Sequence, residues 1–315
     1  NNAKFGNGDW AVLEADESDG SFLKLPINYS IVTNLDHEHL DYYKKYKNLQ
    51  KAFIKFINKT PPIGKSFICL DSLNLKKILK KIKTKNYSTY GFEQKTDYYI
   101  KNVRYKIDNT KFDVIAKNLN GKKKILKNIL IKLIGKHNVL NATAAISVCL
   151  NLGIDSKTIK KALVNFTGVQ RRMTKIFVKN KNEFYDDYAH HPTEISSVLQ
   201  GVKKISKNRK IISVFQPHRF SRVKSLKKKF SLAFKESDLV ILCPIYSAGE
   251  KNDKKYNFLN FSKMISKNSK TQVINIKDDL DLCKYFKKNL IKDEIIIGMG
   301  AGSISTWMRQ LKNRL

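Results

Sequence analysis

Two polar segments in the second half of the chain gather side chains suited to binding an anion. One runs from Asp186 to Glu194 and reads DDYAHHPTE; the other runs from Phe215 to Arg222 and reads FQPHRFSR. Histidine and arginine are costly to bury without partners, so such groups are poor core material. Each segment follows an expected strand, and ligands of open α/β sheets bind at the carboxyl ends of strands. The two segments therefore predict one site for an anionic substrate.

Two segments nearer the start of the chain could hold a divalent cation. The segments EADESD at 14–19 and TNLDHEHLD at 33–41 each come just after an expected strand; both are rich in carboxylates, and the second also carries two histidines. Mg²⁺ needs only one or two protein ligands beside phosphate oxygens and water. If the two strands are neighbours in a parallel sheet, Glu14 and His39 would converge on one ion. A solvated polar turn is the alternative for both segments, and the residues alone leave the two readings about equal.

Two weaker signals concern a nucleotide. His137, Asn138 and Asn141 open an expected helix, where they could contact a purine or a ribose, although polar residues at a helix start are usually caps. Arg171 and Arg172 lie at an expected domain junction and could reach nucleotide phosphates. Ordinary surface charge is the other explanation for these two arginines.

The elements that must position these residues alternate between short apolar strands and helices, which is typical of α/β architecture with a mainly parallel sheet. Strands are expected at 10–15, 29–34, 67–71, 175–178, 211–216, 239–245, 272–276 and 295–299. Helices are expected at 41–57, 137–152, 156–164 and 305–311. The stretch 98–117 alternates polar and apolar residues, which predicts an antiparallel excursion. We expect two domains, 1–168 and 169–315, with the boundary near Gly168.

The composition narrows the class of protein. The formal net charge of +34 comes almost entirely from lysines spread along the whole chain, which favours a generally basic surface over a nucleic-acid interface. A nucleic-acid-binding protein stays the alternative, and it would carry its lysines on one face. No window is apolar enough to span a membrane and no signal peptide is evident. Four scattered cysteines without CxxC spacing fit reduced thiols, so we expect a cytoplasmic protein.

In their order along the chain, these segments resemble the Mur ligase family, and the resemblance covers essentially the whole chain. The segments YSAGE at 246–250 and GAG at 300–302 add to it. It implies a partial central ATPase domain followed by a Rossmann-like C-terminal domain. It also implies an ATP- and Mg²⁺-dependent ligase that adds L-alanine to the carboxylate of UDP-N-acetylmuramate through an acyl phosphate, in peptidoglycan precursor synthesis. The segment FQPHR favours this branch over the tripeptide-recycling branch, which stays the alternative.

The resemblance also implies residue roles where this sequence matches the family's motifs. The ligands of the catalytic Mg²⁺ are implied to be Glu14 and His39. The contacts on the adenine side of ATP are implied to be His137, Asn138 and Asn141. These assignments stand beside the alternatives given above for the same segments.

Further roles are implied for the C-terminal domain. Arg172 and Asp187 are implied to hold ATP from that side. The wall that receives the amino acid is implied to consist of Tyr188, His190, His218, Arg219 and Arg222. Within that set we expect catalytic parts for His190, Arg219 and Arg222, because a planar guanidinium can hold a carboxylate with two hydrogen bonds.

One part of the family pattern has no counterpart here. Family members have a UDP-binding domain and then a phosphate loop that opens the central domain. The sequence Gly64-Lys65-Ser66 is no such loop, because the pattern requires glycine at 59 where this chain has Lys59. We therefore expect the chain to be part of a longer protein, and we expect these 315 residues alone to have negligible ligase activity.

Overall fold

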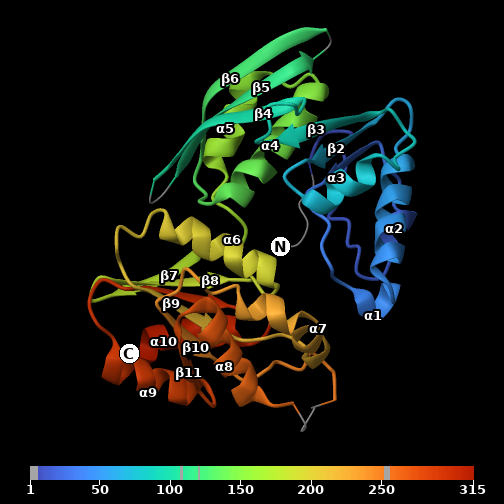
Figure 1. The fold of residues 1–315 in the computed structure, drawn as a ribbon. Coiled ribbons are helices and arrows are strands. Elements are labelled where there is room, and N and C mark those ends of the chain that lie inside the picture. Colours follow the sequence, from blue (N-terminus) through green and yellow to red (C-terminus); the bar gives the residue numbers. More distant parts are fainter. Residues whose placement is uncertain (1–5, 107–108, 120, 252–255) are drawn as a thin grey trace. The chain divides into compact units, whose positions relative to one another are not determined.

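The computed structural model describes residues 6–106, 109–119, 121–251 and 256–315. Two compact units divide the chain: residues 1–101, 113–127 and 140–159 form the first, and residues 102–112, 128–139 and 160–315 form the second. The described residues form two six-stranded sheets with helices around them (Figure 1), which confirms the predicted α/β class. Within the described ranges, no helix has both the length and the apolar character needed to cross a membrane. The domain boundary near Gly168 stays a prediction.

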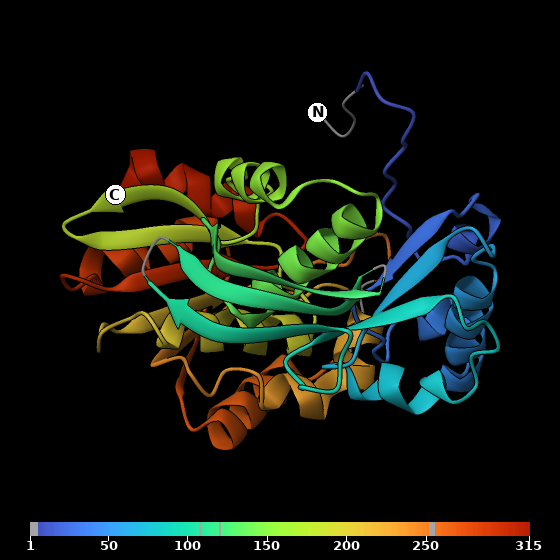
Figure 2. The same ribbon diagram turned by 90° about the horizontal axis from the view of Figure 1, so that it is seen from above.

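The first sheet has its six strands in chain order, from β1 to β6. Their bounds are β1 Tyr29–Val32, β2 Lys65–Cys69, β3 Tyr87–Gly91, β4 Tyr98–Tyr105, β5 Thr110–Leu119 and β6 Lys122–Ile131. The first four strands run parallel. The last three lie side by side (Figure 2) with connections too short for a parallel crossover, so they run antiparallel. Strand β4 and most of β5 fall in the predicted excursion over 98–117, whereas β6 was not predicted.

Most of the helices in the first half match the predicted periodicity. They are η1 Ser21–Lys24, α1 Leu40–Tyr43, α2 Tyr46–Asn58, α3 Leu73–Leu79, α4 Lys136–Asn151 and α5 Ser156–Asn165. Helix α2 buries an apolar stripe that includes Leu49 and Phe53. The single helix predicted over 41–57 is wrong in one respect. It breaks at Lys44, whose φ of 61° lies outside the right-handed helical region.

The strand predicted at Trp10–Ala15 does not form. Trp10 is 56% exposed and Val12 is 96% exposed. The adjacent strand β1 lies at the edge of its sheet and pairs with β2 alone among the described strands. A strand is stabilised only where a neighbouring strand takes its backbone groups, and among the described residues, 10–15 pair with no strand and leave the outer edge of β1 open. Trp10 instead rests edge-on against the Tyr29 ring, with the ring centroids 5.6 Å apart.

The second sheet has the strand order β11-β10-β9-β12-β8-β7. Its strands are β7 Thr174–Lys179, β8 Asn182–Asp187, β9 Ile211–Phe215, β10 Leu239–Leu242, β11 Gln272–Asn275 and β12 Ile295–Met299. All neighbours run parallel except β7, which pairs antiparallel with β8. The central strands β9, β10 and β12 are buried along their whole length, as expected for a parallel sheet covered on both faces.

Helices cover both faces of this second sheet (Figure 1). Helices α6 Pro192–Lys203, α7 Phe220–Ser231 and α8 Phe258–Ser269 pack their apolar side chains into one core. Helices α9 Asp279–Asn289 and α10 Ile304–Arg314 pack into a second core on the other face. Because β12 lies between β8 and β9, the polar segments that follow β8 and β9 meet at the same edge of the sheet.

Candidate functional site

Four aromatic rings line up at the carboxyl edge of the second sheet, and we call them the ring row: Tyr188, His190, His218 and Tyr246. Successive ring centroids are 5.2 Å apart from Tyr188 to His190, 5.8 Å from His190 to His218 and 5.6 Å from His218 to Tyr246. The row joins the segments after β8, β9 and β10. The structure therefore brings the two predicted polar segments together.

The start of helix α6 fixes the β8 end of the ring row. His191 is the N-cap, and its Nδ1 accepts a hydrogen bond from the backbone N–H of Thr193 at 3.3 Å. The Glu194 carboxylate reaches back and accepts from the backbone N–H groups of His190 at 3.0 Å and His191 at 3.2 Å. This reciprocal capping box holds Glu194 beside the His190 ring, with the carboxylate 3.4 Å from Nδ1.

A short backbone pairing fixes the β9 end. The N–H of Tyr246 donates to the carbonyl of Pro217, and the N–H of Arg219 donates to the carbonyl of Tyr246, both at 2.8 Å. The Tyr246 ring stacks on His218 at an interplanar angle of 19°. Its other neighbour is Gly302, where an added Cβ would lie 2.6 Å from Cγ of Tyr246. The glycine is needed because the ring takes the space of a side chain.

Sequence reasoning missed Tyr246 as a member of the site. The available signal was its place in the segment that follows the buried strand β10, next to the equivalent segments of β8 and β9. Its counterpart in the row, Tyr188, was predicted. The Arg171 guanidinium lies 4.6 Å from the Tyr188 ring centroid and that of Arg172 lies 5.8 Å away. Both arginines thus sit where cations favour the face of an aromatic ring.

Two buried carboxylates end strand β8. Asp187 accepts hydrogen bonds from the backbone N–H groups of Met173 and Ala189, each at 2.8 Å. Burial raises the pKa of Asp187 to about 6. Asp186 accepts from the Ser305 hydroxyl at 2.5 Å and from the Arg309 guanidinium at 3.2 Å. These contacts tie the end of β8 to helix α10 and to the start of β7.

The histidines of the ring row are held neutral at pH 7. Burial lowers the pKa of His190, against the attraction of Glu194 for its proton. Burial, followed by the nearby Arg222 charge, lowers the pKa of His218 to about 4. Burial alone would raise the pKa of Glu194, but His190 and the backbone N–H groups hold it below its usual range. The two imidazoles of the ring row are therefore uncharged at pH 7, and the charged Glu194 carboxylate lies beside that of His190.

The first unit contains a separate group of potential metal ligands. Single ligand atoms of Glu17, Glu38 and His39 lie within 4.8 Å of one another. Nε2 of His39 is 3.5 Å from the Glu17 carboxylate and 3.7 Å from that of Glu38. Glu14 is exposed and does not belong to this group. The sequence analysis did not name Glu17 and Glu38, which lie in the same two segments as Glu14 and His39, and the metal role of each of these residues stays a prediction.

The predicted adenine contacts open helix α4. The side-chain amide of Asn138 donates to the carbonyl of Ile134 at 2.8 Å, so in this conformation it closes the turn before the helix. Asn141 is exposed. Burial lowers the pKa of His137 to about 4, so its ring is neutral at pH 7. The roles of these three residues toward a nucleotide stay predictions.

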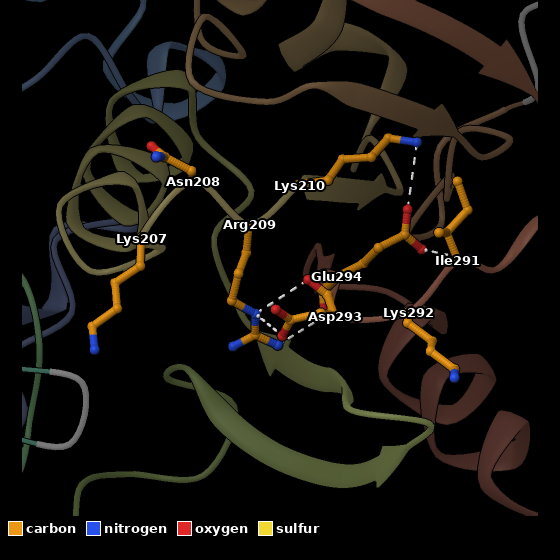
Figure 3. A pocket seen from close by; sticks show the side chains of 8 residues that line it. All are labelled: Lys207, Asn208, Arg209, Lys210, Ile291, Lys292, Asp293 and Glu294. Atoms are coloured by element: carbon orange, nitrogen blue, oxygen red, sulfur yellow. Dashed lines mark hydrogen bonds and ion pairs between the residues drawn. The ribbon is translucent and has the colours of Figure 1, made fainter.

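A hollow of about 280 Å³ lies at the opposite, amino edge of the second sheet (Figure 3). It is lined by Lys207, Asn208, Arg209, Lys210, Ile291, Lys292, Asp293 and Glu294. Arg209 spends its donors on the carboxylates of Glu183 and Asp293 and on three backbone carbonyls. None of the predicted site residues lines the hollow, and its charges compensate one another.

Comparison with known proteins identifies the family to which the chain belongs. Residues 2–149 match the Mur ligase middle domain, and residues 171–302 match the glutamate ligase domain of Mur ligases. The UDP-N-acetylmuramate–L-alanine ligase of Pelagibacter ubique is 53% identical over 99% of this chain and 67% of its own length. The enzyme of the same name from Hydrogenobaculum is 41% identical over 98% of this chain and 66% of its own length.

A solved structure of the same family has a similar fold. The UDP-N-acetylmuramate–alanine ligase of Thermotoga maritima superimposes with a TM-score of 0.73 at 26% sequence identity. The match covers 95% of this chain and 62% of that enzyme. This chain therefore spans roughly two thirds of the length of the relatives that it matches.

Proposed function

This chain belongs to the Mur ligase family, and from that premise we propose that it acts in an ATP-dependent ligase joining L-alanine to the carboxylate of UDP-N-acetylmuramate. The observation that carries the proposal is the 53% identity, over nearly the whole chain, to a relative bearing that name. A reaction on nucleotide-linked precursors of peptidoglycan suits a cytoplasmic protein. The product would be an amide, and ATP would supply the free energy for its formation.

We assign the amino-acid end of the reaction to the carboxyl edge of the second sheet. Arg219 and Arg222 supply planar guanidinium groups, which suit the carboxylate of L-alanine because they can donate two parallel hydrogen bonds. Tyr188, His190 and His218 form the predicted wall, and the ring row orders their three rings. The neutral imidazoles leave the arginines as the cations of this wall, so a free carboxylate has a defined place to bind.

We assign the ATP site to the residues predicted for it from the sequence. Arg172 and Asp187, with His137, Asn138 and Asn141, are proposed to contact ATP. The group Glu17, Glu38 and His39 fits a divalent cation, because two carboxylates and an imidazole present ligand atoms within 4.8 Å. Mg²⁺ bound there would neutralise phosphate charge. Glu14, which the sequence paired with His39, is exposed and stays a predicted ligand.

The chemistry follows in two stages. The muramyl carboxylate attacks the γ-phosphate of ATP, which gives an acyl phosphate and ADP. The amine of L-alanine then attacks the acyl carbon and expels phosphate. Residues of this chain contribute mainly by positioning the amino acid and by stabilising charge, which are the dominant sources of catalysis in such transfers. Arg219 and Arg222 hold the amino acid by its carboxylate, so its nitrogen faces away from them.

The proposal is tested by product formation. The 315-residue chain and the full product of its reading frame are each incubated with ATP, Mg²⁺, UDP-N-acetylmuramate and L-alanine. Mass spectrometry should detect UDP-N-acetylmuramyl-L-alanine with the full product, and little or none with the chain alone. Saturation-transfer NMR measures the binding of L-alanine to the 315-residue chain, which tests the proposed amino-acid site separately.

Three outcomes would count against the proposal. Preferential use of the tripeptide L-alanyl-D-glutamyl-diaminopimelate over L-alanine would favour the recycling branch of the family. Absence of both products, with a folded protein, would leave the family assignment standing and remove the proposed activity. Tight, salt-dependent binding of DNA or RNA would support the alternative that the basic composition raised.

A further inference from the structure

Helices α7 and α8 carry a set of lysines that we call the lysine face. Neither helix contains an acidic residue. The face consists of the exposed lysines on these helices and just beyond their C-terminal ends: Lys224, Lys228, Lys229, Lys235, Lys263, Lys267 and Lys270. Within the described part of the chain, most of them form no ion pair: Lys228, Lys235, Lys263, Lys267 and Lys270. This surface therefore keeps most of its positive charge.

Contacts between the two helices make the lysine face one surface. The Ser269 hydroxyl donates to the carbonyl of Ser231 at 2.8 Å, and the backbone N–H of Phe234 donates to the Ser269 hydroxyl at 3.1 Å. The Phe230 and Phe261 rings meet edge to face, with their centroids 6.1 Å apart. Both helices bury these rings in the core on one face of the second sheet (Figure 1), so their solvent sides point away from the same face.

The spacing along each helix keeps the lysines on the solvent side. Lys224 and Lys228 are four residues apart on α7, and Lys263 and Lys267 are four apart on α8. Side chains at this spacing are neighbours on one side of a helix. Leu232 follows Lys228 by another four residues and is 41% exposed. An exposed leucine thus continues the line of lysines on α7.

The lysine face differs from two other charged surfaces around the same sheet. On the opposite face, the first turn of α9 contains Asp279 and Asp281, and the Arg314 guanidinium lies 2.6 Å from the Asp279 carboxylate. At the amino edge, Arg209 pairs with the Glu183 carboxylate at 3.1 Å. Both surfaces thus compensate their cations, whereas α7 and α8 do not. The lysine-rich composition, which all three share, does not explain this difference.

The chemistry of the lysine face fits an extended anionic surface. Lysine lacks the planar fork with which arginine grips a single phosphate. Nucleic-acid bases stack on exposed aromatic rings, but the Phe230 and Phe261 rings are fully buried. Among the described residues of the two helices and their caps, the exposed large apolar side chains are leucines, Leu232 at 41% and Leu259 at 64%. Lysines beside exposed leucines are typical of surfaces that bind anionic bilayers.

We propose that the lysine face docks this protein on a bilayer that contains anionic phospholipids. The lysines contact the lipid phosphates, and Leu232 enters the boundary between head groups and acyl chains. Each lysine near such a surface strengthens binding roughly fivefold. The face contains none of the residues proposed to bind ATP or L-alanine, so the inference is independent of the ligase reaction.

Co-sedimentation with lipid vesicles tests the docking. The full product of the reading frame is mixed with phosphatidylcholine vesicles that either contain or lack phosphatidylglycerol. At an ionic strength of about 0.1 M we expect binding to the anionic vesicles only. An ionic strength of about 1 M should release the protein, because the Debye length falls from roughly 10 Å to about 3 Å. No binding to the anionic vesicles, or equal binding to both kinds, would overturn the proposal.

Two matched double variants separate the lysine face from the net charge. Lys263→Gln with Lys267→Gln, on α8, should lower the partition coefficient on anionic vesicles by roughly 20- to 30-fold. The control is Lys51→Gln with Lys55→Gln, which removes two exposed lysines at the same spacing from α2. That helix packs against η1, which the acidic segment 14–19 precedes. We expect the control to change the partition coefficient by about twofold at most.

Further measurements complete the test. Circular dichroism and the rate of ligation without vesicles should be unaltered in both double variants, because the exchanged side chains are exposed. Leu232→Ser should weaken vesicle binding several-fold and leave its salt dependence unchanged. Equal losses in the two double variants would mean that net charge alone drives the binding. Tighter binding to duplex DNA than to anionic vesicles, lost with Lys263 and Lys267, would assign the face to nucleic acid. Either result would overturn the proposal.

Discussion

The two edges of the second sheet both concentrate charged residues, but they use them differently. At the amino edge, the hollow around Arg209 has a volume of about 280 Å³, yet the donors of Arg209 are taken up by neighbouring carboxylates and carbonyls (Figure 3). At the carboxyl edge, the capping box and the backbone pairing at Tyr246 fix the rings of His190 and His218. Each ring keeps a nitrogen that faces outward.

This difference separates a structural charge network from a site for a ligand. An arginine whose donors are mostly taken up by protein acceptors holds strands together and has little to offer a second molecule. Neutral imidazoles held at one end by protein contacts can offer the other end to a substrate. The shape of a hollow is therefore a weaker guide here than the direction of its hydrogen-bonding groups.

The largest effect is expected when an arginine is removed from the carboxyl edge. Arg222→Met should lower kcat/KM for L-alanine by roughly 10²- to 10³-fold, because it removes a guanidinium proposed to bind the substrate carboxylate and the donor to His218. Steady-state kinetics at varied L-alanine concentration measure this loss. The free energy of unfolding should change much less. Unaltered use of L-alanine would remove Arg222 from the proposed site.

The matching change at the amino edge should act on stability instead. Arg209→Met removes one donor each from the Glu183 carboxylate, which keeps Lys175 and Tyr185, and from three backbone carbonyls, and we expect it to lower the free energy of unfolding by about 2 kcal/mol. Urea denaturation measures that change. The KM for L-alanine should stay near that of the unaltered protein. A large rise in KM would mean that the hollow takes part in binding.

A smaller effect is expected from crowding the ring row. Gly302→Ala places a Cβ 2.6 Å from both Cγ of Tyr246 and Oε1 of Gln216, so the Gln216 amide must move and the Tyr246 ring must shift away from its place on His218. Such overpacking costs about 1–2 kcal/mol, and the displaced ring should raise KM for L-alanine several-fold. Gly8→Ala, whose added carbon meets no atom within 4 Å, serves as the control. Equal behaviour of the two variants would mean that Tyr246 adapts without consequence.

A last effect concerns pH. Because the pKa of His218 is lowered to about 4 in the folded protein, the unfolded chain binds its proton first as pH falls. The stability that neutral His218 contributes is present above pH 6.5 and is lost as pH falls toward 4. His218→Gln should flatten this part of the profile of unfolding free energy against pH, whereas Arg209→Met should keep its slope. An equal slope in His218→Gln would contradict the lowered pKa.

Much of the second sheet could be predicted from the sequence. Its strands are short apolar runs that end in polar segments, and parallel order places those ends at one edge. The meeting of His190 with His218 followed from that reasoning. The Mur ligase family was also predicted and is confirmed by the comparisons. The residue roles and the domain boundary stay predictions.

Other features depend on partners that a local pattern does not contain. Trp10–Ala15 has the composition of a strand, but pairing needs a neighbouring backbone, and β1 pairs with β2 alone among the described strands. The break at Lys44 depends on one backbone angle. Tyr246 joins the site through stacking on His218, a contact between residues 28 positions apart in sequence. Hydrophobic periodicity indicates which residues of one helix or strand are buried. It contains no information on contacts between residues of different elements.

Glu194 limits how this edge could be redesigned. Its carboxylate closes the capping box of α6 and also lies beside Nδ1 of His190. An engineer who replaces it with glutamine keeps the cap but discards the negative charge next to the imidazole. One who moves the charge elsewhere loosens the first turn of the helix. One side chain thus serves both the folding of α6 and the electrostatics of His190. Substitutions of Glu194 should therefore show strong epistasis with any change at His190.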